Sequence, residues 1–307
     1  MTKNLILSPR TSKDIDDRVE RVLRGLGNPE PPINLDEVRE LLKLDKKFYT
    51  ANDPSLIDEV ISRIRVASIQ VYKRPALFLD VVKKFSLKAL YVPDQKRIFL
   101  DKSQPEIKHR WNEAHEIGHS LIPWHDDVMH GDNDRTLAKD CHEKIEAEAN
   151  FAAGRILFLQ DRFFEEAASM PPTIETIKAL RDRFGNTLST TLYRFVETVG
   201  NEIPIIGIIS KHPHISRRSP EDTYQNMCRH FIQSPAFAKR FSRISEASIM
   251  QWISSYCGAQ RGGPLGDSEL ILNDDNGQLH KFYFETFFNT NEALSLGVYL
   301  VPHFSPK

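Results

Sequence analysis

The chain has 307 residues, and its 41 lysines and arginines against 42 aspartates and glutamates give a net charge of −1 at pH 7. This balance and a hydrophobic content of 40% are typical of soluble globular proteins. The longest apolar run, residues 203–209, is too short to span a bilayer. The first residues show no apolar stretch followed by a small-residue cleavage site, so a secretory signal is not expected. Three widely spaced cysteines favour reduced thiols over disulfides. We therefore expect a cytoplasmic protein without a membrane segment.

The N-terminal region is predicted to be helical. Helical periodicity covers residues 14–26 and 35–44, which the turn-forming sequence GNPEPP at 27–32 separates. Further helices are expected over 54–68 and 75–85. The region could act as a pro-segment or a substrate-recognition cap, but a scaffold is the default interpretation.

The most informative motif is HEIGH at residues 115–119, on a predicted helix over 104–122. Positions i and i+4 share one face of a helix, so the imidazoles of His115 and His119 can reach the same ion. The carboxylate of Glu116 can reach a metal-bound water without being a ligand. The apolar flank of this helix predicts burial, where unpaired polar groups are costly and a metal would satisfy them. The motif therefore predicts a zinc site with Glu116 as general base.

A catalytic zinc site usually has a third protein ligand, and the next predicted helix, 141–159, offers three glutamates. Glu146 lies on the stripe that carries small residues, through which this helix could approach the first one closely. Glu143 and Glu148 are expected on solvated flanks. Glu146 is therefore the predicted ligand, with Glu143 or Glu148 next if it is not.

The two helices resemble the ImmA/IrrE family of metallopeptidases. That family has HExxH, a variable loop and then E-x-x-A-N-x-x-A, and this chain has EAHEIGHSLI from Glu113 and EAEANFAA from Glu146. The resemblance implies one Zn²⁺ per chain, with His115, His119 and Glu146 as ligands and Glu116 as general base. Manganese or iron could occupy the same ligands.

A β-hairpin is expected directly before the zinc helix. Residues 87–92 and 96–100 read as its two strands. In zinc peptidases of this kind, an edge strand beside the active-site helix can pair with an extended substrate. The alternative is an ordinary core hairpin. The residues expected to form the substrate-binding edge are Arg97, Ile98, Phe99 and Leu100.

The segment between the two zinc helices, 123–139, is rich in Asp, His and Gly. It is interpreted as a rim over the site, in which His125, His130 or His142 could stabilise the oxyanion of the tetrahedral intermediate. The alternative interpretation is a solvated loop.

A helix pair is expected over 172–199, and it resembles a helix-turn-helix. Its second helix lacks the basic or amide-rich face that groove binding requires, so a structural role is favoured. Direct nucleic-acid binding is left open. A basic cluster after this pair favours a solvated surface over a nucleic-acid site. The cluster consists of Lys211, Arg217, Arg218, Arg229, Lys239, Arg240 and Arg243.

Residues 201–307 are predicted to form a separate, smaller α+β domain. An Asn-Gly pair at 276–277 marks a hairpin within it. Relatives of the IrrE type can carry a sensor domain at this end, so a sensory or regulatory role is an analogy. Strands are expected over 203–210, 269–272, 281–288 and 294–301, and helices over 222–232 and 245–256.

These predictions describe an α+β protein with a mainly helical, zincin-like metallopeptidase domain over 1–200 that includes the hairpin at 87–100 and the helix pair. The resemblance implies an endopeptidase that cuts a specific regulatory protein, a helix-turn-helix transcriptional repressor, in stress response or mobile-element control. Two alternatives have a non-proteolytic zinc site. One is a DNA-binding or sensory regulator, and the other is a toxin-antitoxin or defence partner.

Overall fold

The structure, a computed structural model, describes residues 3–49, 89–92, 96–125 and 139–300. The helices expected over 54–68 and 75–85 lie outside these residues. The chain divides into an N-terminal unit, Leu7–Gln160 with Phe184–Asn186, and a C-terminal unit, Met1–Ile6, Asp161–Arg183 and Thr187–Lys307. Most of the expected helix pair thus groups with the C-terminal sheet. The domain boundary expected after residue 200 stays a prediction, because compactness alone does not show which segments fold independently.

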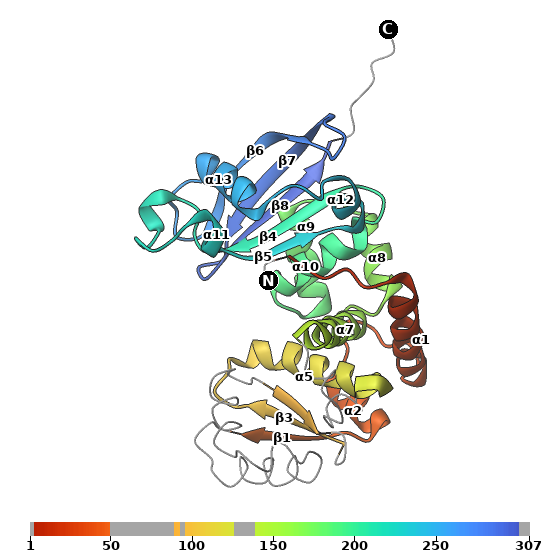
Figure 1. Ribbon diagram of the computed structural model, residues 1–307. Coiled ribbons are helices and arrows are strands. Elements are labelled where there is room, and N and C mark those ends of the chain that lie inside the picture. The colour runs from red at the N-terminus through yellow and green to blue at the C-terminus, as the bar shows by residue number, and fades with distance from the viewer. Residues whose placement is uncertain (1–2, 50–88, 93–95, 126–138, 301–307) are drawn as a thin grey trace. The chain divides into compact units, whose positions relative to one another are not determined.

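The described helices of the N-terminal unit are α1 (Pro9–Gly25), α2 (Leu35–Leu42), α5 (Glu106–Leu121) and α7 (Lys139–Leu157) (Figure 1). Ser8 caps the N-terminus of α1, where its hydroxyl accepts from the Thr11 N–H, and Asn34 caps α2 by accepting from the Asp36 N–H. Helices α5 and α7 pack against each other, and α1 packs against α7. The four helices expected in these regions are confirmed, with ends shifted by a few residues.

The described strands of this unit form a small sheet in the order β1-β3-β2. Strand β1 (Asp45–Tyr49) is parallel to β3 (Arg97–Asp101), and β2 (Ala89–Val92) is antiparallel to it. The predicted edge position of residues 97–100 is therefore wrong, because β3 is the central strand. Strand β1 was not predicted from the sequence, and its pairing with β3 begins where the Asp45 N–H donates to the Lys96 carbonyl at 2.8 Å.

The C-terminal unit is built on a five-stranded antiparallel sheet in the order β5-β4-β8-β7-β6. Its strands are β4 (Ile205–Ser210), β5 (Cys228–Gln233), β6 (Gly263–Asn273), β7 (Leu279–Phe288) and β8 (Ala293–Tyr299). The predicted Asn-Gly hairpin joins β6 to β7, with Gly277 at a positive φ of 81°. Four of these strands were expected, and β6 is longer than the sequence analysis predicted.

Helices cover both faces of this sheet. The described helices after α7 are α8 (Asp161–Ala168), α9 (Ile174–Phe184), α10 (Leu188–Val199), the short η3 (Ile215–Arg217), α11 (Tyr224–Met227), α12 (Pro235–Arg240) and α13 (Glu246–Tyr256). Helix α10 lies so close to β4 that a Cβ at Gly207 would be 2.9 Å from the Val196 side chain. On the other face, Phe237 and Ile253 join Phe282 and Phe284 in the core.

The packing of α10 bears on its resemblance to a helix-turn-helix. Seven of its twelve residues, Leu188 among them, are buried. The Ser189 hydroxyl donates to Glu292 in the loop before β8 at 2.8 Å. A recognition helix must present one face to a groove. The structural role favoured by the sequence fits this packing.

One predicted element is wrong in its second half. The helix expected over 222–232 is helical only at Tyr224–Met227, and Cys228–Gln233 forms β5. Phe231 and Ile232 are both buried, because they lie on opposite faces of a strand that pairs with β4. Short apolar segments fit both helical and strand periods, and the long-range pairing decided between them.

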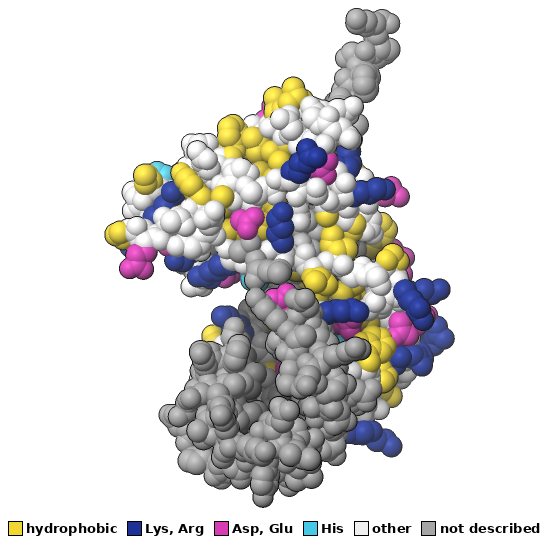
Figure 2. Space-filling view, in the orientation of Figure 1, with side chains coloured by type: hydrophobic (Ala, Val, Ile, Leu, Met, Phe, Trp, Pro, Cys, Tyr) yellow, Lys and Arg dark blue, Asp and Glu magenta, His cyan; other side chains and the backbone are white. Residues whose placement is uncertain are grey.

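The basic cluster of the C-terminal unit is largely paired. Lys211 is 2.6 Å from Asp222, and Arg229 is 2.6 Å from Glu292. Arg217 donates to a backbone carbonyl at 2.9 Å. On the face shown in Figure 2, lysine and arginine side chains are interspersed with aspartate and glutamate. None of the helices in the described part of the chain has the length and apolar character needed to cross a membrane.

Candidate metal centre

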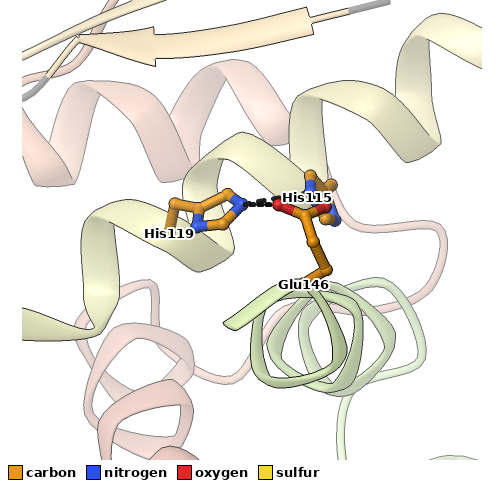
Figure 3. A group of neighbouring side chains, drawn as sticks. All are labelled: His115, His119 and Glu146. Atoms are coloured by element: carbon orange, nitrogen blue, oxygen red, sulfur yellow. Dashed lines mark hydrogen bonds and ion pairs between the residues drawn. The ribbon is translucent and has the colours of Figure 1, made fainter. Parts of the chain in front are cut away.

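Three side chains from α5 and α7 converge on one point (Figure 3). The Nε2 atoms of His115 and His119 are 3.1 Å apart. The carboxylate of Glu146 lies 3.3 Å from His115 Nε2 and 3.7 Å from His119 Nε2. Within the described residues these three form a group whose donor atoms all lie within 4.8 Å of one another. Two imidazoles and one carboxylate suit a divalent metal and leave a coordination position open.

The close approach of α5 and α7 brings Glu146 to the histidines. A Cβ at Gly118 would lie 2.7 Å from the Ala149 carbonyl oxygen and 3.2 Å from the Ala152 Cβ. Both alanines are fully buried. Only a glycine in the motif and small residues on α7 allow this spacing, as the stripe of small residues predicted.

Each histidine makes a second hydrogen bond on the side of the ring away from this group. His115 Nδ1 is 3.0 Å from Asn150 Oδ1, an acceptor, so His115 donates through Nδ1. His119 Nδ1 is 2.9 Å from His125 Nδ1, and His125 Nε2 is 3.0 Å from Glu148 Oε2. Such contacts orient metal-binding imidazoles in proteins.

Glu116 lies beside the three converging side chains and is buried. Burial raises the pKa of its carboxyl, as does the charge of Glu146, while the charge of His115 and a hydrogen bond from the Tyr91 N–H lower it. The resulting pKa of Glu116 is about 7. A carboxyl with this pKa can exchange protons near neutral pH.

The pKa of His115 is also raised. Burial disfavours its imidazolium, but the hydrogen bond to Glu146 and the charges of Glu116 and Glu146 outweigh that effect. The carboxyl groups of Glu116 and Glu146 thus favour a positive charge at this position. A bound cation would interact favourably with the same carboxyl groups.

The other glutamates of α7 differ in position. Glu148 was expected on a solvated flank, and this is wrong, because its side chain is only 2% exposed. It accepts hydrogen bonds from Trp124 Nε1 at 2.6 Å and from His125. Glu143 is partly exposed and does not belong to the converging group.

The remaining predicted site residues do not belong to the group of three converging side chains. Ile98, Phe99 and Leu100 are buried in the small sheet, as the alternative of a core hairpin predicts. His125 is fully buried behind His119, and this position does not support an oxyanion role. The side chain of His142 and the whole of His130 lie outside the described residues. Arg97 forms an ion pair with Asp45 of β1 at 3.2 Å, and substrate contact by the four β3 residues stays a prediction.

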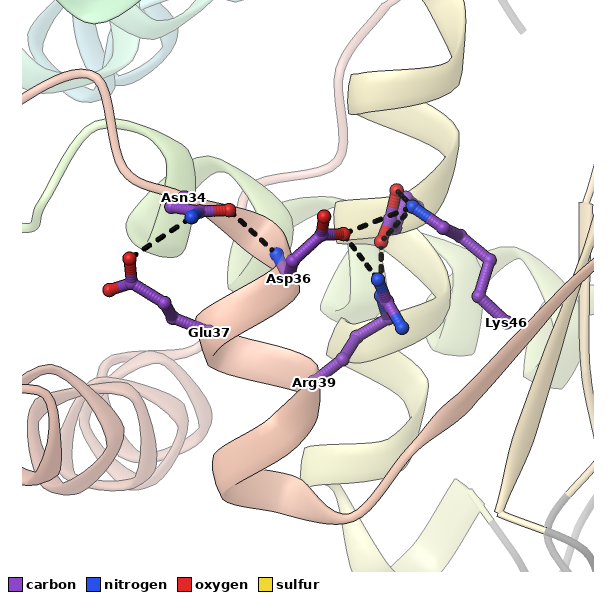
Figure 4. Close-up of polar contacts among 6 residues, drawn as sticks. Asn34, Asp36, Glu37, Arg39 and Lys46 are labelled. Carbon is purple, nitrogen blue, oxygen red and sulfur yellow. Dashed lines mark hydrogen bonds and ion pairs between the residues drawn. The ribbon is translucent and has the colours of Figure 1, made fainter.

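An ion-pair network centred on the buried Glu113 holds α5 against α2 and β1 (Figure 4). The Glu113 carboxylate lies 2.6 Å from Arg39 Nε and 3.1 Å from Lys46 Nζ. Both cations also pair with Asp36, whose pKa their hydrogen bonds lower. Glu113 lies two residues before His115, so this network fixes the helix that carries the motif.

Some of these contacts were not predicted from the sequence. Asn150 is four residues after Glu146, and this helical spacing was a usable signal for its place beside the histidines. The partners of Glu113 come from α2 and β1, and no local pattern connects them to α5. Likewise, no local pattern connects Trp124 to Glu148 or Tyr91 to Glu116.

Comparisons with known proteins agree with this geometry. Residues 67–196 match the family model of the IrrE N-terminal-like domain. A stretch of 133 residues, 42% of this chain, is 26% identical to the radiation response metalloprotease IrrE of Deinococcus radiodurans. The match covers 40% of that relative, less than half its length. A solved structure of a Mycobacterium tuberculosis transcriptional regulator has a TM-score of 0.51 over 93% of this chain and 76% of its own, at 16% identity, which shows a similar fold alone.

Proposed function

Because residues 67–196 match the family model of the IrrE N-terminal-like domain, we propose that this protein is a zinc-dependent endopeptidase that cleaves a specific regulatory protein. The observation that carries the proposal is the convergence of His115, His119 and Glu146 beside the buried Glu116. A closed structural zinc site has no use for a proton-exchanging carboxyl next to its ligands. The proposed cofactor is one Zn²⁺ per chain.

The residues have distinct roles in this proposal. The bound metal supplies a Lewis acid that polarises a peptide carbonyl and lowers the pKa of water. Glu116, which is buried beside the three converging side chains, would take the proton of the attacking water and pass it to the leaving amine. His115 and His119 direct Nε2 toward Glu146, because their Nδ1 atoms are bonded elsewhere.

Strand β2 is the part of the small sheet best placed to bind an extended substrate. It is an outer strand of the described sheet. The Tyr91 N–H of this strand donates to Glu116, so the backbone of β2 lies directly at the reacting carboxyl. A peptide lying against β2 would present its carbonyl groups to the same site. This assignment replaces the β3 edge that the sequence predicted.

We take the substrate class from the family resemblance: a helix-turn-helix transcriptional repressor, cut in stress response or mobile-element control. The proposed cleavage takes place in the cytoplasm and does not involve a membrane. The alternative is a regulator that binds DNA or a partner without cutting it. The packing of α10 against its own sheet does not favour a DNA-reading role for this helix.

The test compares new protein N-termini in native host cells that express wild type, Glu116→Gln or Glu197→Gln, with and without DNA-damaging or oxidative stress. Glu197 is a matched control, because it is also a glutamate with a pKa of about 7 but lies in the C-terminal unit. We expect one regulator to gain a new N-terminus in wild type and Glu197→Gln and not in Glu116→Gln. The same set of N-termini in all three strains, with metal bound, would show that the protein is not a protease.

A further inference from the structure

We propose that His125 and Glu148 form a positioning relay that holds His119 in the tautomer whose Nε2 can bind a metal ion. This inference deepens the proposed function, because it rests on the same metal site. Glu148, His125 and His119 lie in one hydrogen-bonded line, and none of their side chains is more than 3% exposed. The line links α7 to the turn after α5.

With Glu148 ionised and both histidines neutral, the contacts determine where each proton lies. The Glu148 carboxylate, 3.0 Å from His125 Nε2, can only accept, so His125 carries a proton on Nε2. In neutral His125 the other nitrogen, Nδ1, is then an acceptor. His119 Nδ1 lies 2.9 Å from it and must donate. The proton of neutral His119 is therefore on Nδ1, and its lone pair is on Nε2, the atom that faces His115 and Glu146.

The opposite arrangement would prevent metal binding. If His125 donated through Nδ1, His119 Nδ1 would have to accept, and a neutral His119 would then carry its proton on Nε2. That proton would point at the place where a metal ion must bind. The carboxylate at the far end of the line excludes this arrangement for neutral His125, because it requires a proton on His125 Nε2.

The relay is itself held in place. Trp124 Nε1 donates to Glu148 Oε2 at 2.6 Å, and Lys144 Nζ lies 3.8 Å from Oε1. The His125 N–H donates to the Ile122 carbonyl at 2.9 Å, which fixes the turn after α5. His115 reaches the same tautomer by a simpler route, through the acceptor oxygen of Asn150. The two histidines thus have independent orienting partners.

A purely structural role for His125 makes different predictions. If the buried line only fills space and pairs charge, its loss would lower stability and leave the His119 tautomer and metal affinity unchanged. A positioning role predicts a change in both quantities in a folded protein. Orienting partners of metal ligands are worth about 10- to 100-fold in affinity.

The test measures zinc affinity of the full chain by competition with a chelator, and the His119 tautomer of the metal-free chain by long-range ¹H–¹⁵N NMR. His125→Phe fills the space without an acceptor, and His125→Asn restores an acceptor oxygen near the position of Nδ1. Glu148→Gln keeps the size of the carboxylate but not its charge. His212→Phe, in the C-terminal unit, controls for loss of a buried histidine.

We expect wild-type His119 to carry its proton on Nδ1. His125→Phe should mix the tautomers and weaken zinc binding by about 10- to 100-fold. His125→Asn should recover most of that loss, Glu148→Gln should lose less than about tenfold, and His212→Phe should bind zinc like wild type. A wild-type proton on His119 Nε2, or unchanged zinc affinity in folded His125→Phe, would overturn the relay.

Two features keep the experiment decisive. If His125→Phe does not fold, the wild-type tautomer and the comparison of His125→Asn with Glu148→Gln still decide. Zinc affinity and tautomer do not depend on cleavage. A chain that binds zinc as expected but cuts no protein would refute the proposed function and leave the relay standing.

Discussion

The two units both bury histidines and carboxyl groups, but they arrange them differently. In the N-terminal unit, His115, His119 and Glu146 point to one place, and their neighbours orient them. Among the described residues of the C-terminal unit, His212 and Asp274 instead pair separately. His212 Nε2 is bonded to the Gln260 carbonyl at 2.8 Å, and His280 bonds to Asp274 within the β6-β7 hairpin. Convergence, and not burial, separates the candidate site from the scaffold.

Two glutamates with similarly raised pKa values, one in each unit, also differ in their neighbours. Burial is the largest cause of a pKa of about 7 for both Glu116 and Glu197. Glu116 lies beside two histidines and a second carboxylate, whereas Arg194 and Asn4 are the partners of Glu197. A raised pKa therefore identifies a reactive site only together with converging neighbours.

The largest expected effect tests that convergence. Glu146→Gln should weaken zinc binding by about a thousandfold, because one of three protein ligands is lost from a binding free energy of about 10–16 kcal/mol. Glu143→Gln, on the same helix, should bind within about threefold of wild type. Competition with a chelator measures both. If Glu143→Gln caused the larger loss, the ligand assignment on α7 would have to change.

The second prediction compares buried with exposed ion pairs. Glu113→Gln should lower the free energy of unfolding by about 3 kcal/mol, because it leaves Arg39 and Lys46 without their buried partner. Glu269→Gln breaks a pair with Lys281 in which both side chains are 51% exposed, and should cost less than about 1 kcal/mol. Urea denaturation measures both. Equal losses would contradict the role given to the network around Glu113.

The third prediction concerns the spacing of the helices. Gly118→Ala should cost about 2 kcal/mol of stability, since the new Cβ would lie 2.7 Å from the Ala149 carbonyl oxygen. It should also weaken zinc binding, because α7 carries Glu146. Gly207→Ala, crowded by Val196 in the C-terminal unit, should destabilise the protein without changing zinc affinity. Thermal unfolding and chelator competition test the pair, and a shared loss of affinity would count against our explanation.

The smallest effect is a pH dependence of stability. Burial raises the pKa of Glu197 from 4.5 to about 7, so the folded protein binds this proton more tightly than the unfolded chain does. Its contribution to stability is therefore present below pH 4.5 and is lost as the pH rises through 7. Glu197→Gln should be more stable than wild type by about 1 kcal/mol near pH 8. This value is smaller than the full pKa shift would give, because the side chain is 26% exposed and solvent screens its charge. The difference should vanish near pH 4, as urea titrations at the two pH values can show.

Local spacing determined much of the candidate site. The helical period alone places His115 and His119 on one face, and the stripe of small residues on α7 predicts both Glu146 and the close approach at Gly118. The family resemblance came from the same two helices, and residues 67–196 match the IrrE N-terminal-like domain. These features follow from the sequence because they depend on neighbours within one or two helical turns.

Tertiary structure alone decided the rest. The central position of β3, the burial of Glu148 and the change from helix to strand at Cys228 each depend on a partner distant in the chain. Strand pairing and buried ion pairs form between segments whose local patterns do not identify each other. The sequence thus determined which side chains could bind a metal, and long-range packing decided which of them are buried, oriented and brought together.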